Sequence, residues 1–344
     1  MNSFRLLRAA LLFPAVLCVC SFVKAQENPQ KPEQTIRVSV DRVNVGVIVT
    51  DHTGHFVEGL RREDFRVFDN GIEQPLTGFA AIEEPAQVLL LIEAGPAVYL
   101  LEAGHLQAAL ALLNGLSNGD RVAVVKYAET PQAILDFTPD KQAAAAALEQ
   151  LRFNLGFGSL NLASSVSKAL EWLTQVQGKR AIVLLSTGVD TSPPNEPSMV
   201  LQQLKVSDVR LLAVSLTGDL QNPQPSNKKK SSSANFNKTA QQFEQANQLL
   251  KRMAESTGGR AYFPASEKDF SAAYAEIAQL VRHEYSLAFA PPVRDGLVHT
   301  IEVRVNAPQT RTLNTQPVAY RIDHRRAYVA PLSGSEPAFD PPAK

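Results

Sequence analysis

Two uninterrupted apolar runs constrain the fold of this 344-residue chain most strongly. Residues 88–92 and 181–185 contain only aliphatic side chains, a pattern typical of strands that helices cover on both faces of a sheet. Between them, Leu106, Leu110 and Leu113 recur on one face of a helix. Strands that alternate with helices predict an α/β fold with a doubly wound, mainly parallel sheet and right-handed crossovers.

The flanks of this α/β unit show another pattern. Residues 43–49 carry valine at every second position, as a half-buried strand does, and further strands are predicted at 285–289, 299–305 and 318–322. We therefore expect a smaller, discontinuous antiparallel β-sandwich, in which residues 35–84 pack with residues 284–330. The α/β unit, residues 86–283, is inserted between these two parts.

Two further segments have a polar or Pro-rich composition. Residues 221–238 are rich in Asn, Ser and Pro and carry three consecutive lysines, which predicts a flexible, solvated loop within the α/β unit. Residues 331–344 are expected to form a tail.

The N-terminus has the pattern of a secretory signal peptide. Arg5 and Arg8 precede an apolar run, residues 9–23, which ends shortly before Ala25. We expect residues 1–25 to be a signal peptide, residues 26–34 a linker, and the mature protein to be exported, either periplasmic or extracellular. The apolar run is short for a membrane span, so we expect no span after signal removal. An uncleaved N-terminal anchor is the alternative.

Charge and composition exclude several function classes. Removal of the signal peptide takes away three of the 34 basic residues and leaves 31 against 34 acidic ones, so the strong positive field of a nucleic-acid-binding protein is missing. Both cysteines, Cys18 and Cys20, lie inside the signal segment, which excludes disulfides and a cysteine nucleophile in the mature chain. No Gly-x-Ser-x-Gly follows a predicted strand, and phosphate loops, dinucleotide fingerprints and HExxH are also missing from the sequence. We do not expect an enzyme.

Several spaced segments resemble a known family. They lie at residues 40–51, 59–71 (GLRREDFRVFDNG), 256–263 (STGGRAYF) and 285–291 (YSLAFAP). The α/β unit resembles a von Willebrand factor A (VWA) domain, and the mature chain resembles the VWFA-related proteins of the acidobacterial type. The resemblance is specific for the fold and much weaker for function.

The resemblance implies a metal-ion-dependent adhesion site, and this sequence departs from its pattern. In the family, Mg²⁺ is held by an Asp-x-Ser-x-Ser loop after the first strand, a Thr of a later loop and an Asp after the fourth strand. Here the first loop offers Glu93, Gly95 and Ala97, while the Thr aligns with Leu160 and the Asp with Thr187. Mg²⁺ needs hard oxygen ligands in near-octahedral geometry. We therefore expect a degenerate site with no metal and no cofactor; the alternative is a rebuilt Mg²⁺ site of Glu93, Ser159, Thr187 and Asp190.

The edge where the metal site would lie remains the expected binding surface, because open α/β sheets bind their ligands at the carboxyl ends of their strands. Apolar and aromatic groups in the loop after Glu93 are what a metal-free protein interface would use. The candidate binding residues are Glu93, Pro96, Tyr99, Ser159, Asn161, Thr187 and Asp190. We expect an exported, non-enzymatic module that binds an unidentified protein partner. The alternatives are a metal-dependent adhesin with a rebuilt site and a structural component of an envelope assembly.

Overall fold

The computed structural model describes residues 42–82, 85–95, 102–151, 158–217, 233–306 and 320–332. The predicted signal peptide, the linker, Pro96, Tyr99 and most of the tail lie outside these residues. Within them, no helix is both long enough and apolar enough to cross a membrane.

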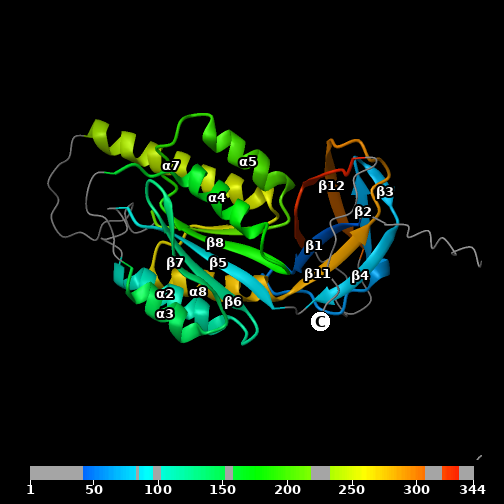
Figure 1. The fold of residues 1–344 in the computed structure, drawn as a ribbon, viewed down its shortest axis with the longest axis horizontal. Helices are drawn as coiled ribbons and strands as arrows, with labels where there is room; N and C mark the ends of the chain where they lie inside the picture. The colour runs from blue at the N-terminus through cyan, green and yellow to red at the C-terminus, as the bar shows by residue number, and fades with distance from the viewer. Residues whose placement is uncertain are drawn as a thin grey trace, which may run out of the picture. The chain divides into compact units, whose positions relative to one another are not determined.

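The central element is a six-stranded sheet with the strand order β10-β9-β8-β5-β6-β7 (Figure 1). Its strands are β5 (Ala86–Glu93), β6 (Arg121–Tyr127), β7 (Pro131–Thr138), β8 (Lys179–Ser186), β9 (Arg210–Ser215) and β10 (Ala261–Tyr262). All neighbours pair in parallel except β6 and β7, which are antiparallel. The two apolar runs of the sequence thus form β5 and β8, adjacent strands in the middle of the sheet.

Helices cover both faces of this sheet. One face is packed by α2 (Glu102–Gly115), α3 (Lys141–Glu149) and α8 (Glu267–Arg282), and the other by α4 (Leu162–Leu173), α5 (Glu196–Val206) and α7 (Ser233–Ser256). Along β5, Val88 and Leu90 belong to the first core, whereas Leu89 and Leu91 belong to the second. Because successive side chains of a strand point to opposite faces, a continuous apolar run is what this position requires.

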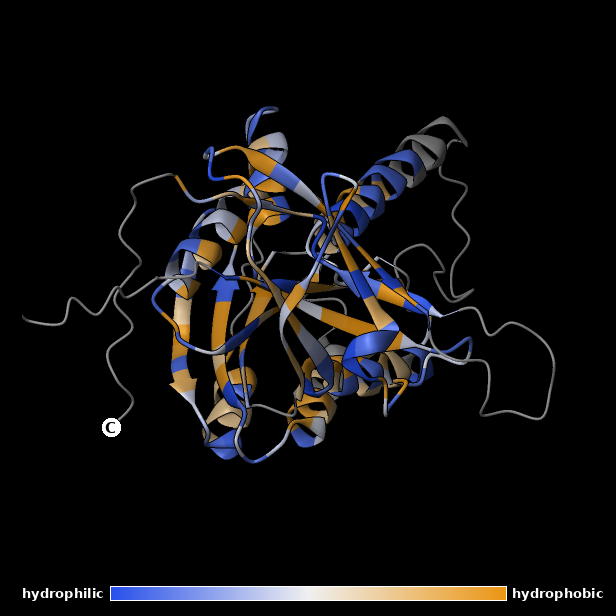
Figure 2. Cartoon of the chain, turned by 90° about the vertical axis from the view of Figure 1, so that its right-hand side faces the viewer, coloured by the Kyte–Doolittle hydropathy of each residue, from blue (hydrophilic) through white to orange (hydrophobic). Residues whose placement is uncertain are grey.

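Two four-stranded antiparallel sheets are built from strands that precede the α/β unit in the sequence and strands that follow it. One has the order β13-β1-β11-β4, and the other β14-β12-β2-β3. The strands are β1 (Val43–Thr50), β2 (Phe65–Asp69), β3 (Ile72–Gln74), β4 (Leu76–Ile82), β11 (Glu284–Phe289), β12 (Val298–Val305), β13 (Arg321–His324) and β14 (Ala327–Val329); a 3-10 turn, η1 (Arg62–Asp64), precedes β2. They enclose a third core (Figure 2), to which β1 contributes its alternating valines. The predicted fold class, a mainly parallel α/β sheet with a discontinuous antiparallel β part, is confirmed.

Some predicted boundaries are wrong. Helix α7 begins at Ser233, so residues 233–238 of the predicted loop are helical; their Asn and Ser residues are weak helix formers, which a long helix tolerates once its packed part has formed. Strand β13 spans Arg321–His324 rather than 318–322 because its pairing with β1 runs from Thr50 to Val47. Strands β7 and β14 and helix α5 were not predicted.

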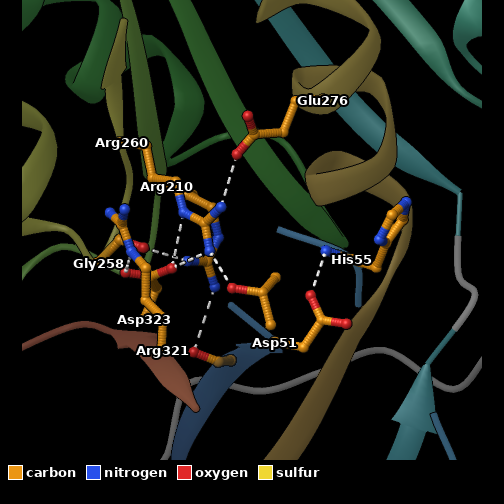
Figure 3. Close-up of polar contacts among 10 residues, drawn as sticks. Asp51, His55, Arg210, Gly258, Arg260, Glu276, Arg321 and Asp323 are labelled. Atoms are coloured by element: carbon orange, nitrogen blue, oxygen red, sulfur yellow. Dashed lines mark hydrogen bonds and ion pairs between the residues drawn. The ribbon is translucent and has the colours of Figure 1, made fainter. Parts of the chain in front are cut away.

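A buried ion-pair network joins the α/β part to the β-sandwich (Figure 3). Arg260, 5% exposed, lies just before β10, and its Nε donates to Oδ2 of Asp323 on β13 at 2.8 Å. Its second terminal nitrogen donates to Oγ1 of Thr50 on β1 at 2.8 Å, and its first to Oε1 of Glu276 on α8 at 2.6 Å. One guanidinium thus connects three elements that are far apart in the sequence.

Candidate functional site

Glu93 lies at the carboxyl end of β5, between β6 and β8, at the edge where an open α/β sheet binds ligands. Its side chain is completely buried. The backbone N–H of Thr187 donates to Glu93 Oε2 at 2.8 Å, and the Thr187 hydroxyl donates to Oε1 at 2.9 Å. Glu93 and Thr187, which align with metal-ligand positions of the family, are therefore in contact. The Thr187 hydroxyl, however, donates its hydrogen to the Glu93 carboxyl group.

Two further hydroxyls complete the environment of this carboxylate. Tyr127, the last residue of β6, donates to Ser186 Oγ at 2.7 Å, and Ser186, the last residue of β8, donates to Glu93 Oε2 at 2.9 Å. The backbone N–H of Gly188 donates to Ser186 Oγ at 2.8 Å. Tyr127 and Ser186 are fully buried. The polar groups form a closed network of satisfied donors and acceptors, which is the condition for burying them at low cost.

Leu160, which is partly exposed, packs against the Gly95 backbone beside this network. A Cβ atom added to Gly95 would lie 2.8 Å from Leu160 Cδ2 and 3.4 Å from Glu93 Oε1, so the leucine methyls lie directly against the Gly95 backbone beside the carboxylate. The backbone of Leu160 is held by Thr191, whose N–H donates to the Leu160 carbonyl at 2.7 Å and whose Oγ1 accepts from the Leu160 N–H at 2.8 Å. Gly95 thus leaves the space that Leu160 fills.

The other predicted binding residues have separate roles. Asp190 accepts from the backbone N–H of Ala163 at 3.1 Å and of Ser192 at 2.9 Å, so its carboxylate serves the first turn of α4. Asn161 donates from Nδ2 to the Glu129 carbonyl at 2.9 Å. Ser159 is exposed. Pro96 and Tyr99 lie outside the described residues, and the structure does not test their predicted part in binding.

A divalent cation does not fit these residues. Mg²⁺ prefers several oxygen ligands with free lone pairs and retained waters, whereas both Glu93 oxygens already accept hydrogen bonds from Thr187 and Ser186. Leu160, at the position that aligns with the family's threonine, brings methyl groups and no hydroxyl to the Gly95 backbone. Among the residues that the structure describes, no group of three or more His, Cys, Asp or Glu side chains could hold a metal ion.

Burial raises the pKa of the Glu93 carboxyl above its ordinary value, although the hydrogen bonds from Thr187 and Ser186 oppose the shift. A carboxyl group with a raised folded-state pKa contributes stability below its unfolded pKa of about 4.3, and this contribution is lost as the pH rises through the folded-state value. Apolar burial thus disfavours the charged form.

Glu93→Gln is therefore expected to flatten the pH dependence of stability. The amide keeps the size and the acceptor oxygen but cannot ionise, so the wild type should lose stability relative to the variant as the pH rises above about 4.3. Urea unfolding of both proteins between pH 4 and pH 8 measures this. A wild-type-minus-variant difference that stays constant over the range would contradict the assignment.

Sequence analysis missed three parts of this site: Tyr127, Ser186 and the packing of Leu160 against Gly95. Tyr127 and Ser186 are the carboxyl-terminal residues of their strands, and polar residues at that position of a predicted parallel sheet are the signal that could have located them. The sequence analysis noted Leu160 only as the residue that replaces the family's threonine. Its contact with Gly95 depends on the loop conformation, which spacing alone does not define.

The fold and this site define an open α/β domain in which the edge at the carboxyl ends of the strands carries a buried, hydroxyl-capped carboxyl group. The family model of the von Willebrand factor type A domain matches residues 105–274, and the chain contains such a VWA domain. The match begins after β5, so Glu93 precedes the matched residues. None of the curated proteins compared with the chain matches it.

Solved structures that match this chain include a von Willebrand factor type A protein from Catenulispora acidiphila, at 11% identity and a TM-score of 0.45 over 78% of this chain and 74% of that one. The manganese-loaded TRAP protein of Plasmodium vivax is similar at 13% identity and a TM-score of 0.42, over 76% of this chain and 97% of that one. An aerotolerance-related membrane protein from Bacteroides fragilis is similar at 16% identity and a TM-score of 0.41, over 57% of this chain and 98% of that one.

Proposed function

We propose that the chain is an exported, non-enzymatic module that binds a protein partner through the top loops of its VWA domain without a metal ion. VWA domains commonly mediate protein interactions, and the presence of this domain supports the interaction role. The metal-free mode is supported by one observation above all: the Glu93 carboxyl group is fully buried, and both of its oxygens accept hydrogen bonds from the protein. Neither oxygen is exposed to a cation or to a partner.

The proposal that the chain is not an enzyme is supported by the polar groups at the carboxyl ends of the strands. Tyr127, Ser186 and Thr187 hold one another and Glu93, all four almost completely buried, so none is placed to attack a bound substrate. The single Gly-x-Ser-x-Gly match in the sequence, residues 115–119, follows helix α2 and leads into β6. A nucleophile elbow needs the opposite order, strand and then helix.

Metal independence is tested by thermal unfolding in EDTA and then in millimolar Mg²⁺ or Mn²⁺. A cation at about a hundred times its dissociation constant would add about 2.7 kcal/mol, and several degrees to the midpoint of a domain of this size. We expect no saturable shift. A saturable rise that Glu93→Ala abolishes would instead support the rebuilt metal site.

Partner binding through the top loops is tested with the immobilised protein and extracts of the cell envelope, in EDTA throughout. A partner retained by the wild type should be lost from the variant Pro96→Ala/Tyr99→Ala and kept by Pro292→Ala, a change at an exposed position before the β11–β12 turn. Equal retention by all three proteins would place the interface elsewhere.

Export is tested by fractionation and by sequencing the N-terminus of the mature protein, where a start at Gln26 is expected.

A further inference from the structure

A second site lies at the opposite end of the sheet from Glu93. A cavity of about 350 Å³ opens where the α/β part meets the β-sandwich. Its walls come from the starts of β8 and β9, from β1 and β11, and from the loop before β14 that carries Arg325. Leu280 and Val281 of α8 provide an apolar wall. This volume is in the range of small-molecule pockets.

Positive charge predominates in this basal cavity. Two carboxylates, Asp208 and Glu284, line it together with four cationic side chains: Lys179, Arg180, Arg210 and Arg325. The lining therefore has a formal excess of two basic over acidic side chains. Low-dielectric walls strengthen the attraction of such a site for anions.

The carboxylates are already used by the cations nearest to them. Arg180 pairs with Asp208. Arg210 lies 3.4 Å from Glu284 Oε2 and donates to the Gly46 carbonyl at 3.2 Å. Arg210 also donates to the Gly258 carbonyl (Figure 3). Gly46 makes this approach possible, since a Cβ there would lie 2.8 Å from Glu284 Oε2. Two of the four cations are therefore neutralised.

The remaining two cations have unused donors. Lys179 Nζ lies 3.7 Å from Glu284 Oε1, beyond hydrogen-bond distance, and within the described part of the chain it makes no hydrogen bond. Arg325 donates from a terminal nitrogen to the Asn44 carbonyl at 2.6 Å, but its buried Nε has no partner among the described residues. Burial lowers the pKa of both groups. Buried donors without partners are costly unless a ligand or water satisfies them.

We propose that the basal cavity binds a small dianion, an organic phosphate or a dicarboxylate, through Lys179 and Arg325. The excess charge of the lining matches a dianion, and guanidinium and ammonium groups are the usual donors to phosphate and carboxylate. Lys179 belongs to the α/β part and Arg325 to the β-sandwich, so the ligand would bridge the two. The site is independent of the top loops and of the proposed protein partner.

Isothermal titration calorimetry of the purified protein tests this, with inorganic phosphate, succinate and acetate at matched ionic strength. Wild type is expected to bind phosphate or succinate saturably and to bind acetate far more weakly. The tighter of the two dianions assigns the ligand to the phosphate or the dicarboxylate class. Lys179→Met should weaken dianion binding at least about tenfold, because it removes a charge-assisted hydrogen bond.

The control is Lys251→Met, the same change at an exposed lysine of α7, which should leave the affinity unchanged. Lys179→Met removes the ion pair with Glu284, which keeps Arg210 as its partner, so the thermal midpoint without added anion is measured to show that the variant remains folded. Saturable binding that survives Lys179→Met unchanged would overturn the proposal, as would the lack of saturable binding of either dianion to the wild type.

Discussion

Arg260→Met is expected to lower the free energy of unfolding by about 3–5 kcal/mol, because removing one partner of a buried ion pair leaves the other charge uncompensated. Asp323 is only 8% exposed and would lose two hydrogen bonds from the guanidinium. Arg321 Nε, 3.1 Å from Asp323 Oδ1, would compensate partly. Chemical denaturation of the variant and the wild type measures the loss.

The matched control is Arg304→Met, at an arginine that is 57% exposed and paired with Glu302, two residues before it on β12. A surface pair of this kind contributes little to stability because solvent screens it. The double variant Arg260→Met/Asp323→Asn should recover part of the loss, because no buried charge is then left alone. A loss no larger than that of Arg304→Met would show that the network does not hold the two parts of the chain together.

The sequence predicts the framework of this fold because burial leaves a local signature. Residues 88–92 are apolar at every position since β5 is covered on both faces, and β1 carries valine at alternate positions since one of its faces lines the sandwich core. The turn at Asn70–Gly71 is equally local, with φ angles of 47° and 81° that these two residue types adopt most cheaply.

Elements with weak local signatures were missed. Strand β7 (PQAILDFT) is an edge strand with few buried residues, so neither alternation nor an apolar run marks it. Helix α5 follows a Pro-rich segment whose composition is typical of a loop. Pro197 nevertheless lies in the first turn of α5, where proline is well tolerated. In both cases the tertiary environment, rather than local pattern, determines the structure.

The candidate site was predicted only in part, because the ends of strands can be located from the sequence whereas the paths of loops cannot. Glu93 ends β5 and Thr187 directly follows the neighbouring parallel strand β8, so strand topology brings them together. The side chains of Ser159 and Asp190 belong to loops, and only the three-dimensional path shows that Asp190 serves the start of α4. The Arg260–Asp323 pair spans 63 positions, a contact that no spacing rule predicts.

Restoring the family's ligand set is expected to create a metal site that we propose the wild type lacks. In the variant Glu93→Asp/Gly95→Ser/Ala97→Ser/Leu160→Thr/Thr187→Asp, two carboxylates and three hydroxyls replace the capped Glu93 network and the leucine. Hard oxygens in this number suit Mg²⁺ and Mn²⁺. The thermal midpoint of the variant should rise by several degrees at saturating Mn²⁺, about 2.7 kcal/mol at a hundred times the dissociation constant, while that of the wild type stays constant.

The decisive control keeps Leu160 in an otherwise identical fourfold variant. A serine at position 95 would place its Cβ 2.8 Å from Leu160 Cδ2, so one of the two must shift, and position 160 still supplies methyl groups in place of a hydroxyl. This variant should therefore be less stable than the fivefold variant and show a weaker response to Mn²⁺. If both variants respond equally, Leu160 is not what closes the site. If neither responds although both fold, the ligand positions inferred from the family do not converge in this chain.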